Sequence, residues 1–412
     1  MKMMKLALLG GAALAVTSAA AYADDLSALK AEIEALNSRV AQLEATPSVP
    51  AGYSLMTVTT ADAYAIPGYE EMDSGVGKKA TVIGILPAAD APASTSIEWS
   101  GYVKAGIVYN HFKDGGVDGG SDSDIDVPAR GQIKVVGKTD TAVGEVGALI
   151  KIRGDFDGAS VGSAYVKEAW GWWKMTPELT LSGGYTGTLG NIGFGYDGAC
   201  SCYFTDNADV GMNPGDTSQM RLSYASGPLS FAIALEDATG GGRSFSSLNA
   251  SSDNSLGAAA EIKYAGDSFS GEISGYWRDH NKHQVDTNGD GVINVLDGFV
   301  GTDSAYGVGI GGAFSLGDIA TISLGTQVGQ YNNGVDFWRA SILGTMNLSD
   351  AVHAEIAFGH TSNNHGVDDT SAVLAGIYYD PVSQLTIGLE GEWIDQGNDT
   401  AYTADLVTVF RF

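Results

Sequence analysis

The feature that most constrains this chain is a long series of segments, from Ile97 to Phe412, in which apolar and polar residues alternate. In the first segment Trp99 lies on an apolar face, whereas Glu98 and Lys104 lie on the opposite face. Successive side chains of a β-strand point to opposite faces of its sheet. Each segment therefore predicts a strand with one face in water and the other in an apolar medium.

Sixteen such segments can be counted. Most of them are close to the ~9–11 residues that a tilted membrane-spanning strand needs. Their approximate cores are 97–110, 129–138, 143–153, 164–175, 179–187, 217–225, 229–236, 256–265, 269–279, 304–314, 319–330, 336–346, 351–360, 371–379, 384–394 and 401–412.

The connections between these segments alternate in length. Short turns such as Thr139-Asp140 and Asp380-Pro381 are separated mostly by longer polar loops, at 111–128, 154–163, 188–216, 237–255, 280–303 and 361–370. Outer-membrane barrels have this layout, whereas a β-sandwich would not give so regular an asymmetry. Closure also removes exposed sheet edges. The sequence therefore predicts an all-β fold, a 16-stranded antiparallel transmembrane β-barrel over residues 96–412.

Residues 1–23 have the pattern of a secretory signal peptide. Lys2 and Lys5 form the positive start, Leu6–Val16 the apolar stretch, and Ala21-Tyr22-Ala23 the cleavage site. A membrane anchor is the alternative, but this apolar stretch is shorter than a spanning helix. No apolar run of ~18 residues follows, so we expect insertion into the membrane by the barrel.

Residues 24–46 carry apolar residues three and four positions apart, at Leu26, Leu29, Ile33, Leu36, Val40 and Leu43. This spacing favours a periplasmic coiled coil, and a single amphipathic helix lying on the barrel is the alternative. β-branched Ile33 and Val40 at one position of the apolar seam favour a two-stranded coiled coil. Residues 39–44 instead resemble a short pattern that specifies three-stranded coiled coils. Residues 47–95 are predicted to be a linker that partly packs on or in the barrel.

The last segment ends on an aromatic residue. Its apolar face carries Tyr402, Ala404, Leu406, Thr408, Phe410 and Phe412. Aromatic rings are favoured at the boundary of the membrane. This ending resembles the C-terminal recognition signal of bacterial outer-membrane proteins.

Three further stretches resemble the alphaproteobacterial outer-membrane porins. Ser100–Lys104 is similar to their first strand, and Glu168–Trp172 to a strand before their constriction loop. Arg221–Tyr224, followed by Gly227-Pro228, resembles the strand and turn after that loop. The resemblance implies a sixteen-stranded homotrimer, which favours a three-stranded coiled coil, with loop 188–216 folded into the barrel. The family's Pro-Glu-Phe-Gly-Gly element is missing from this loop, so the sequence does not assign the narrowest point.

The resemblance also implies a charged pore. The constriction loop carries the acidic residues Asp197, Asp206, Asp209 and Asp216. The water-facing positions of the early strands carry the basic residues Lys104, Arg130, Lys134, Lys151, Arg153 and Arg221. Opposed charges across a narrow aqueous gap create a transverse field, which favours small dipolar solutes over apolar ones. The alternative is that these charged side chains only keep the water-facing side of the barrel hydrated.

Residues 286–297 match the spacing of a calcium-binding loop. Oxygen ligands would come from Asp286, Asn288, Asp290, the Val292 carbonyl, Asn294 and Asp297, with Gly291 at the sharp turn. The loop resembles those of EF-hand and dockerin modules, and it ends in Asp instead of Glu, as dockerins do. We expect a structural Ca²⁺ that stiffens an external loop. A solvated turn is the alternative, and no organic cofactor is expected.

Cys200 and Cys202 are the only cysteines, and both lie in the predicted constriction loop. In an oxidising compartment they form a disulfide, stay as free thiols or link two molecules, and the sequence leaves these alternatives open. The two cysteines have no flanking His, which argues against a zinc site. No spacing typical of a catalytic triad is present, and we expect no enzymatic activity.

The sequence therefore predicts an outer-membrane porin of a Gram-negative bacterium that passes small hydrophilic solutes and ions by diffusion. The net charge of −27 argues against a nucleic-acid partner. One alternative is a channel selective for a sugar or an anion, with Tyr102, Trp170 and Trp172 as a stacking track. Another is a tether that joins the envelope to the cell wall through the coiled coil.

Overall fold

The computed structural model describes a defined set of residues. They are Ile33 and residues 55–71, 73–86, 95–115, 120–156, 162, 164–196, 200–205, 210–237, 256–280, 283–284, 299–300, 302–363 and 368–412. The chain divides into two compact units, and the larger one comprises Met56–Ile85 and Ala93–Phe412. The predicted signal peptide, the predicted calcium loop and nearly all of the predicted coiled coil lie outside the described residues.

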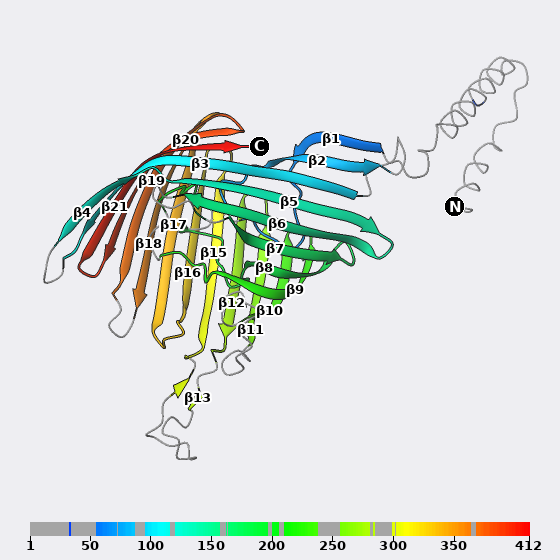
Figure 1. The fold of residues 1–412 in the computed structure, drawn as a ribbon. Helices are drawn as coiled ribbons and strands as arrows, with labels where there is room; N and C mark the ends of the chain where they lie inside the picture. Colours follow the sequence, from blue (N-terminus) through cyan, green and yellow to red (C-terminus); the bar gives the residue numbers. More distant parts are fainter. Residues whose placement is uncertain are drawn as a thin grey trace, which may run out of the picture. The chain divides into compact units, whose positions relative to one another are not determined.

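Sixteen antiparallel strands close into a barrel (Figure 1). They are β3 (Thr95–Lys113), β5 (Ala129–Thr141), β6 (Gly144–Phe156), β7 (Tyr165–Lys174), β8 (Leu179–Gly187), β9 (Asp216–Ser226), β10 (Leu229–Asp237), β11 (Leu256–Ala265), β12 (Phe269–Arg278), β15 (Ala305–Leu316), β16 (Ala320–Gln330), β17 (Asp336–Ser349), β18 (Val352–Asn363), β19 (Thr370–Val382), β20 (Leu385–Gln396) and β21 (Asp399–Arg411). The last strand pairs with the first, from Thr400 opposite Lys113 to Arg411 opposite Tyr102, and this pairing closes the ring. All sixteen predicted segments are confirmed as barrel strands.

The two faces of the barrel differ as the alternation predicts. Trp99, Ile107 and Phe410 lie on the outer face and are 47%, 53% and 52% exposed. Their polar neighbours, among them Lys104 and Glu390, are buried inside. An apolar outer band with a polar interior is the pattern of a membrane barrel. No helix within the described ranges combines the length and the apolarity needed to cross a membrane.

Tight turns join the strands at one end of the barrel. Gly227 between β9 and β10 has φ +58°, and Gly317 between β15 and β16 has φ +61°. These left-handed conformations favour glycine because a Cβ atom would clash with the backbone. We call this end of the barrel the short-turn end, and the N-terminus of β3 lies there too.

Five further strands lie outside the ring. They are β1 (Leu55–Asp62), β2 (Lys79–Leu86), β4 (Ser121–Asp126), β13 (His283–Gln284) and β14 (Phe299–Val300). The hairpin of β1 and β2 adds to the start of β3, where Thr81 faces Trp99 and Ile85 faces Thr95. The segment predicted as a linker therefore contains an ordered hairpin. Its connecting residues 63–78 enter the barrel.

Candidate functional site

Among the described residues, two segments of the chain lie inside the barrel. One is the connection between β1 and β2, residues 63–78, which we call the N-terminal loop. The other is the connection between β8 and β9, residues 188–215, which we call the constriction loop. We call the inner face of β3 and β5–β9 the basic wall, and the inner face of β10–β12 and β15–β21 the acidic wall.

The first part of the N-terminal loop is held by apolar and aromatic contacts. Ile66 is 5% exposed and packs with Val136, Leu149, Trp170 and Trp172 of the basic wall. The ring of Tyr64 stacks on that of Trp172, with their centroids 6.1 Å apart. The backbone N–H of Tyr64 donates to Glu98, at 2.8 Å. Burial of these side chains favours docking of the loop on the wall.

The next part of the loop neutralises the basic wall. The carboxylate of Glu71 lies 2.9 Å from Lys134 Nζ and 2.5 Å from Lys151 Nζ. Lys151 also lies 2.8 Å from Glu168, which accepts a hydrogen bond from Thr186. The lysine side chain is 1% exposed, so it needs these carboxylates to offset the loss of its hydration.

Asp73 fills the same role one level further from the short-turn end. It forms an ion pair with Arg153, and Tyr102 donates its hydroxyl hydrogen to Asp73 at 2.9 Å. The Gly75 N–H donates to the other carboxylate oxygen at 2.9 Å. Burial by itself would raise the pKa of the Asp73 carboxyl, but Arg153 and Lys151 outweigh it and hold that pKa below its ordinary value.

The N-terminal loop also reaches the neighbouring strands. Glu70 forms an ion pair with Lys263 of β11. Arg221 of β9 donates to the Gly68 carbonyl at 2.6 Å and to the Gly187 carbonyl at 3.0 Å. The loop therefore bridges the basic wall and the beginning of the acidic wall.

The other predicted basic residues also lie inside. Arg130 forms an ion pair with Asp155 on the adjacent strand. Lys104 donates to the Tyr203 carbonyl of the constriction loop, and its ammonium lies 4.6 Å from the ring centroid of Phe204. All six predicted basic residues thus lie on the inner face of the early strands.

The carboxylates that pair with Lys134, Lys151 and Arg153 in the described residues are not among the four predicted ones. Asp197, Asp206 and Asp209 lie outside the described residues. Asp216 is the first residue of β9 and pairs with Lys167, so the constriction loop ends one residue earlier than predicted. Glu70, Glu71 and Asp73 were not predicted as site residues, because residues 47–95 were interpreted as a linker. The run Glu70-Glu71 beside Asp73 is the signal that would have found them.

The constriction loop is bound by the acidic wall through its backbone. The N–H groups of Ser201 and Tyr203 donate to Glu355 and Glu390, each at 2.8 Å. Nearer the start of the loop, the Gly193 N–H donates to Glu272. Carboxylates that accept such hydrogen bonds satisfy the backbone N–H groups of a buried loop.

The same loop is also anchored through its carbonyl groups and by close packing. Arg278 donates to the Pro214 carbonyl at 3.1 Å, and Arg339 donates to that of Gly211. A Cβ atom at Gly309 or Gly311 would lie 2.7 Å from Ile192. Glycine at these positions of β15 therefore lets the loop lie directly against the wall.

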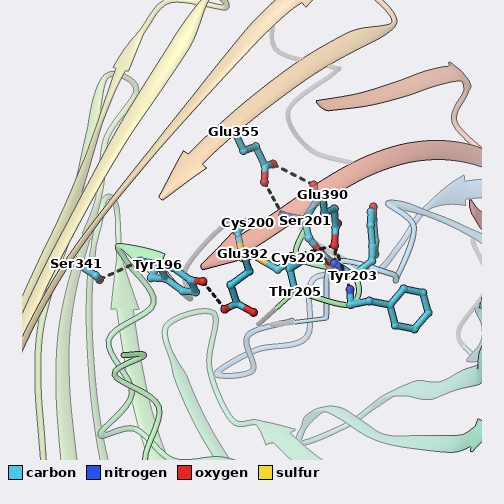
Figure 2. The surroundings of a disulfide bond; sticks show 12 residues. Tyr196, Cys200, Ser201, Cys202, Tyr203, Thr205, Ser341, Glu355, Glu390 and Glu392 are labelled. Atoms are coloured by element: carbon cyan, nitrogen blue, oxygen red, sulfur yellow. Dashed lines mark hydrogen bonds between the residues drawn. A yellow bond between two sulfur atoms is a disulfide. The ribbon is translucent and has the colours of Figure 1, made fainter. Parts of the chain in front are cut away.

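Cys200 and Cys202 are joined by a disulfide in the constriction loop. Figure 2 shows Ser201 between them, with its hydrogen bonds to Glu355, and Tyr203 beside Glu390. Ser201 Oγ donates to Glu355 at 3.0 Å, next to the amide bond. The disulfide thus lies where wall carboxylates bind the residues on either side of Cys202.

The carboxylates of the acidic wall were not predicted as site residues either. Six of them are buried, at Glu236, Glu272, Glu355, Glu390, Glu392 and Asp405. Their place on the polar side of each period-two pattern is a signal that could have found them. Among the described residues no group of three or more His, Cys, Asp or Glu side chains could hold a metal ion.

A cavity of about 710 Å³ lies between the N-terminal loop, the constriction loop and the walls. Charged residues of both signs line it, including Asp73, Arg130, Lys167, Arg221 and Glu261. Tyr102, Trp170 and Trp172, predicted as a stacking track, are instead buried against the N-terminal loop. The space for a solute in this structure is therefore a polar, charged chamber.

Comparison with known proteins places the fold among outer-membrane channels. The chain is similar to the outer membrane channel DcaP of Acinetobacter baumannii, with 15% identity and a TM-score of 0.57, over 77% of this chain and 98% of that one. A loop L8 deletion mutant of OmpT, an outer membrane protein of Vibrio cholerae, has 15% identity and a TM-score of 0.54, over 77% and 100%.

An anion-selective porin from Comamonas acidovorans has 9% identity and a TM-score of 0.53, over 77% of this chain and 100% of that one. No protein-family model matches the chain, and no curated protein matches it in sequence. At these identities the likeness shows the fold alone, a porin-type β-barrel. The alphaproteobacterial resemblance stays a prediction.

Proposed function

We propose that this protein forms a water-filled channel in the outer membrane of a Gram-negative bacterium, through which small hydrophilic solutes and ions diffuse. The observation that carries the proposal is a closed barrel whose apolar outside encloses opposed basic and acidic walls. Opposed charges around a polar chamber order water, which favours small dipolar solutes over apolar ones. The porin-like structural neighbours favour a channel over an enzyme.

Conductance in planar bilayers tests this proposal. Purified full-length protein should insert in steps of ohmic current, and liposomes that contain it should swell in small sugars. A homotrimer, as implied by the porin resemblance, would give openings in groups of three. A protein that inserts into the bilayer and passes no current would contradict the proposal.

A solute-selective channel is the second candidate, and the charged chamber favours an anion over a sugar as its solute. Lys104, Arg130, Lys167 and Arg221 line the cavity, whereas the aromatic residues of the predicted sugar track are covered. Saturable block of the current by one small anion, without block by sugars, would support this candidate. A current that stays proportional to the concentration of every solute would favour general diffusion.

The predicted coiled coil and calcium loop belong to this proposal as accessory parts. Deletion of residues 24–46 should weaken attachment of the envelope to the cell wall and leave conductance unchanged. Residues 286–297 should bind Ca²⁺ in the full-length protein, which calorimetry measures. The Asp286→Ala, Asp290→Ala variant is the matched control, and equal heats from both proteins would contradict the calcium site.

A further inference from the structure

Three features of the N-terminal loop set it apart from the constriction loop. It enters the barrel from the short-turn end as the tip of a hairpin, whereas the constriction loop is fixed at both ends by barrel strands β8 and β9. The hairpin pairs with the barrel through Thr81–Ile85 of β2 alone, alongside the first residues of β3. Withdrawal of the loop therefore leaves every hydrogen bond between barrel strands intact.

The second feature is how the loop is held. Its carboxylates pair with side chains of the basic wall, at Glu71 with Lys134 and Lys151, and at Asp73 with Arg153. Arg153 also lines the cavity, so a passing anion meets its guanidinium group, and withdrawal of the loop would expose Lys134 and Lys151 as well. Ions in the lumen compete for such groups, whereas they do not compete for backbone amides already bound to fixed wall carboxylates.

The third feature is the space the loop takes. Its tip lines the cavity through Gly68, Tyr69, Glu70, Asp73 and Ser74, and Ser74 Oγ donates to the Ser201 carbonyl of the constriction loop at 2.7 Å. The ring centroid of Tyr69 lies 5.5 Å from the ammonium group of Lys134 and 5.3 Å from that of Lys151. The two loops together leave the cavity as the free volume between them.

We propose that residues 63–78 are a releasable plug, an anionic segment that docks on the basic wall and lowers conductance until it withdraws. This inference rests on the proposed channel function. Small multivalent anions are the chemical class that releases the plug, because they bind the cationic groups that Glu71 and Asp73 occupy when the plug is docked. The exposed basic wall then becomes part of the conducting path.

The first test removes the charges that hold the plug. Glu71→Gln with Asp73→Asn keeps the shape of both side chains and removes three ion pairs with buried cations. The docking equilibrium should shift toward release by about tenfold or more, seen as longer occupancy of a higher-conductance level in single-channel records. Asp62→Asn is the matched control, because it removes an exposed ion pair with Lys79, where the two strands of the hairpin meet the N-terminal loop.

The second test locks the plug in place. A Cβ atom at Gly68 would lie 3.4 Å from Ser223 Cβ, which is close to the separation in a disulfide. Oxidised Gly68→Cys, Ser223→Cys protein should stay at the low conductance level, even with a multivalent anion such as inorganic pyrophosphate present. Each single-cysteine variant is a control, because it keeps the native Cys200–Cys202 pair and cannot cross-link the loop.

The third test asks for rescue. Asp73→Lys places a cation beside Arg153 and should release the plug, and Arg153→Glu in the same protein should restore docking. The outcomes separate the two proposals. Equal conductance in the wild-type, neutralised and cross-linked proteins would overturn the plug and leave the channel standing. No current from any inserted variant would overturn the channel, and the plug with it.

Discussion

The two walls of the lumen keep buried charges stable by different means. The basic wall is matched by side chains, because Glu71 and Asp73 of the N-terminal loop pair with lysines and an arginine. The acidic wall is matched mainly by backbone, because Glu355 and Glu390 accept hydrogen bonds from N–H groups of the constriction loop. Each solution offsets the cost of removing an ion from water.

This difference indicates which of the two loops stays bound inside the barrel. A backbone N–H of a loop inside the barrel needs a hydrogen-bond acceptor. Breaking its bond to a wall carboxylate leaves both the N–H group and the carboxylate without a partner. An ion pair can exchange one partner for a free ion of the same charge. The constriction loop is therefore a fixed part of the barrel, and the N-terminal loop is the part that solutes, salt and pH can displace. The following predictions test this comparison.

The largest effect is expected at Lys151, whose ammonium lies between Glu71 and Glu168. Lys151→Met should lower the free energy of unfolding by about 3–5 kcal/mol, because the buried Glu168 and the partly buried Glu71 lose their shared cation. Denaturant titration in detergent micelles measures the change. Lys79→Met, which removes an exposed ion pair, is the control and should cost at most about 1 kcal/mol. Equal effects of the two variants would show that the basic wall does not depend on the plug.

The next effect is expected at Glu390, which accepts hydrogen bonds from the backbone of Tyr203 and Phe204 and from Thr205 Oγ1. Glu390→Ala leaves these buried donors without an acceptor and should destabilise this part of the constriction loop by roughly 2–4 kcal/mol. Hydrogen exchange at the Tyr203 and Phe204 amides measures it. Glu390→Gln should recover part of the loss because one acceptor oxygen remains. Unchanged exchange in the alanine variant would refute a fixed constriction loop.

Acid should release the plug only at low pH. The pKa of Asp73 is lower in the docked loop than in free aspartate, so the docked state binds fewer protons. Docking is therefore favoured above the ordinary aspartate pKa of about 3.9 and is lost as the pH falls through the lower docked value. Conductance recorded from pH 7 downward should rise only below about pH 4, and Asp73→Asn should abolish that step. A rise already complete at pH 6 would contradict the ion pair with Arg153.

The smallest effect is expected from the disulfide. Cys200→Ser with Cys202→Ser opens a ring closed by a sequence separation of two, so the loss of chain-entropy stabilisation should be at most about 2 kcal/mol. Ser201 and Tyr203 stay bound to the acidic wall in this variant, which further limits the effect. Thermal unfolding of the double variant measures it. A loss comparable to that of Lys151→Met would mean that the bridge, and not the wall carboxylates, fixes the constriction loop.

The barrel strands could be predicted from the sequence, whereas the segments that lie inside the barrel could be predicted only in part. The period-two pattern around Trp99 and Lys104 gave every barrel strand and the side of the sheet on which each charge lies, because alternation along a strand is a local property. The same pattern does not tell which residues lie across the lumen. The carboxylates opposite Lys134 were therefore expected from the constriction loop, whereas Glu71 supplies one.

The sequence by itself determined the number of barrel strands, their inward and outward faces, the short-turn end and the basic character of the early strands. Only the tertiary structure decided that Glu71 and Asp73 would reach Lys151 and Arg153, about 80 residues away along the chain. The physical reason is that a strand's faces are set by neighbouring residues and the membrane. The partner of a buried charge is set by whichever segment closure of the barrel brings within a few ångströms of it.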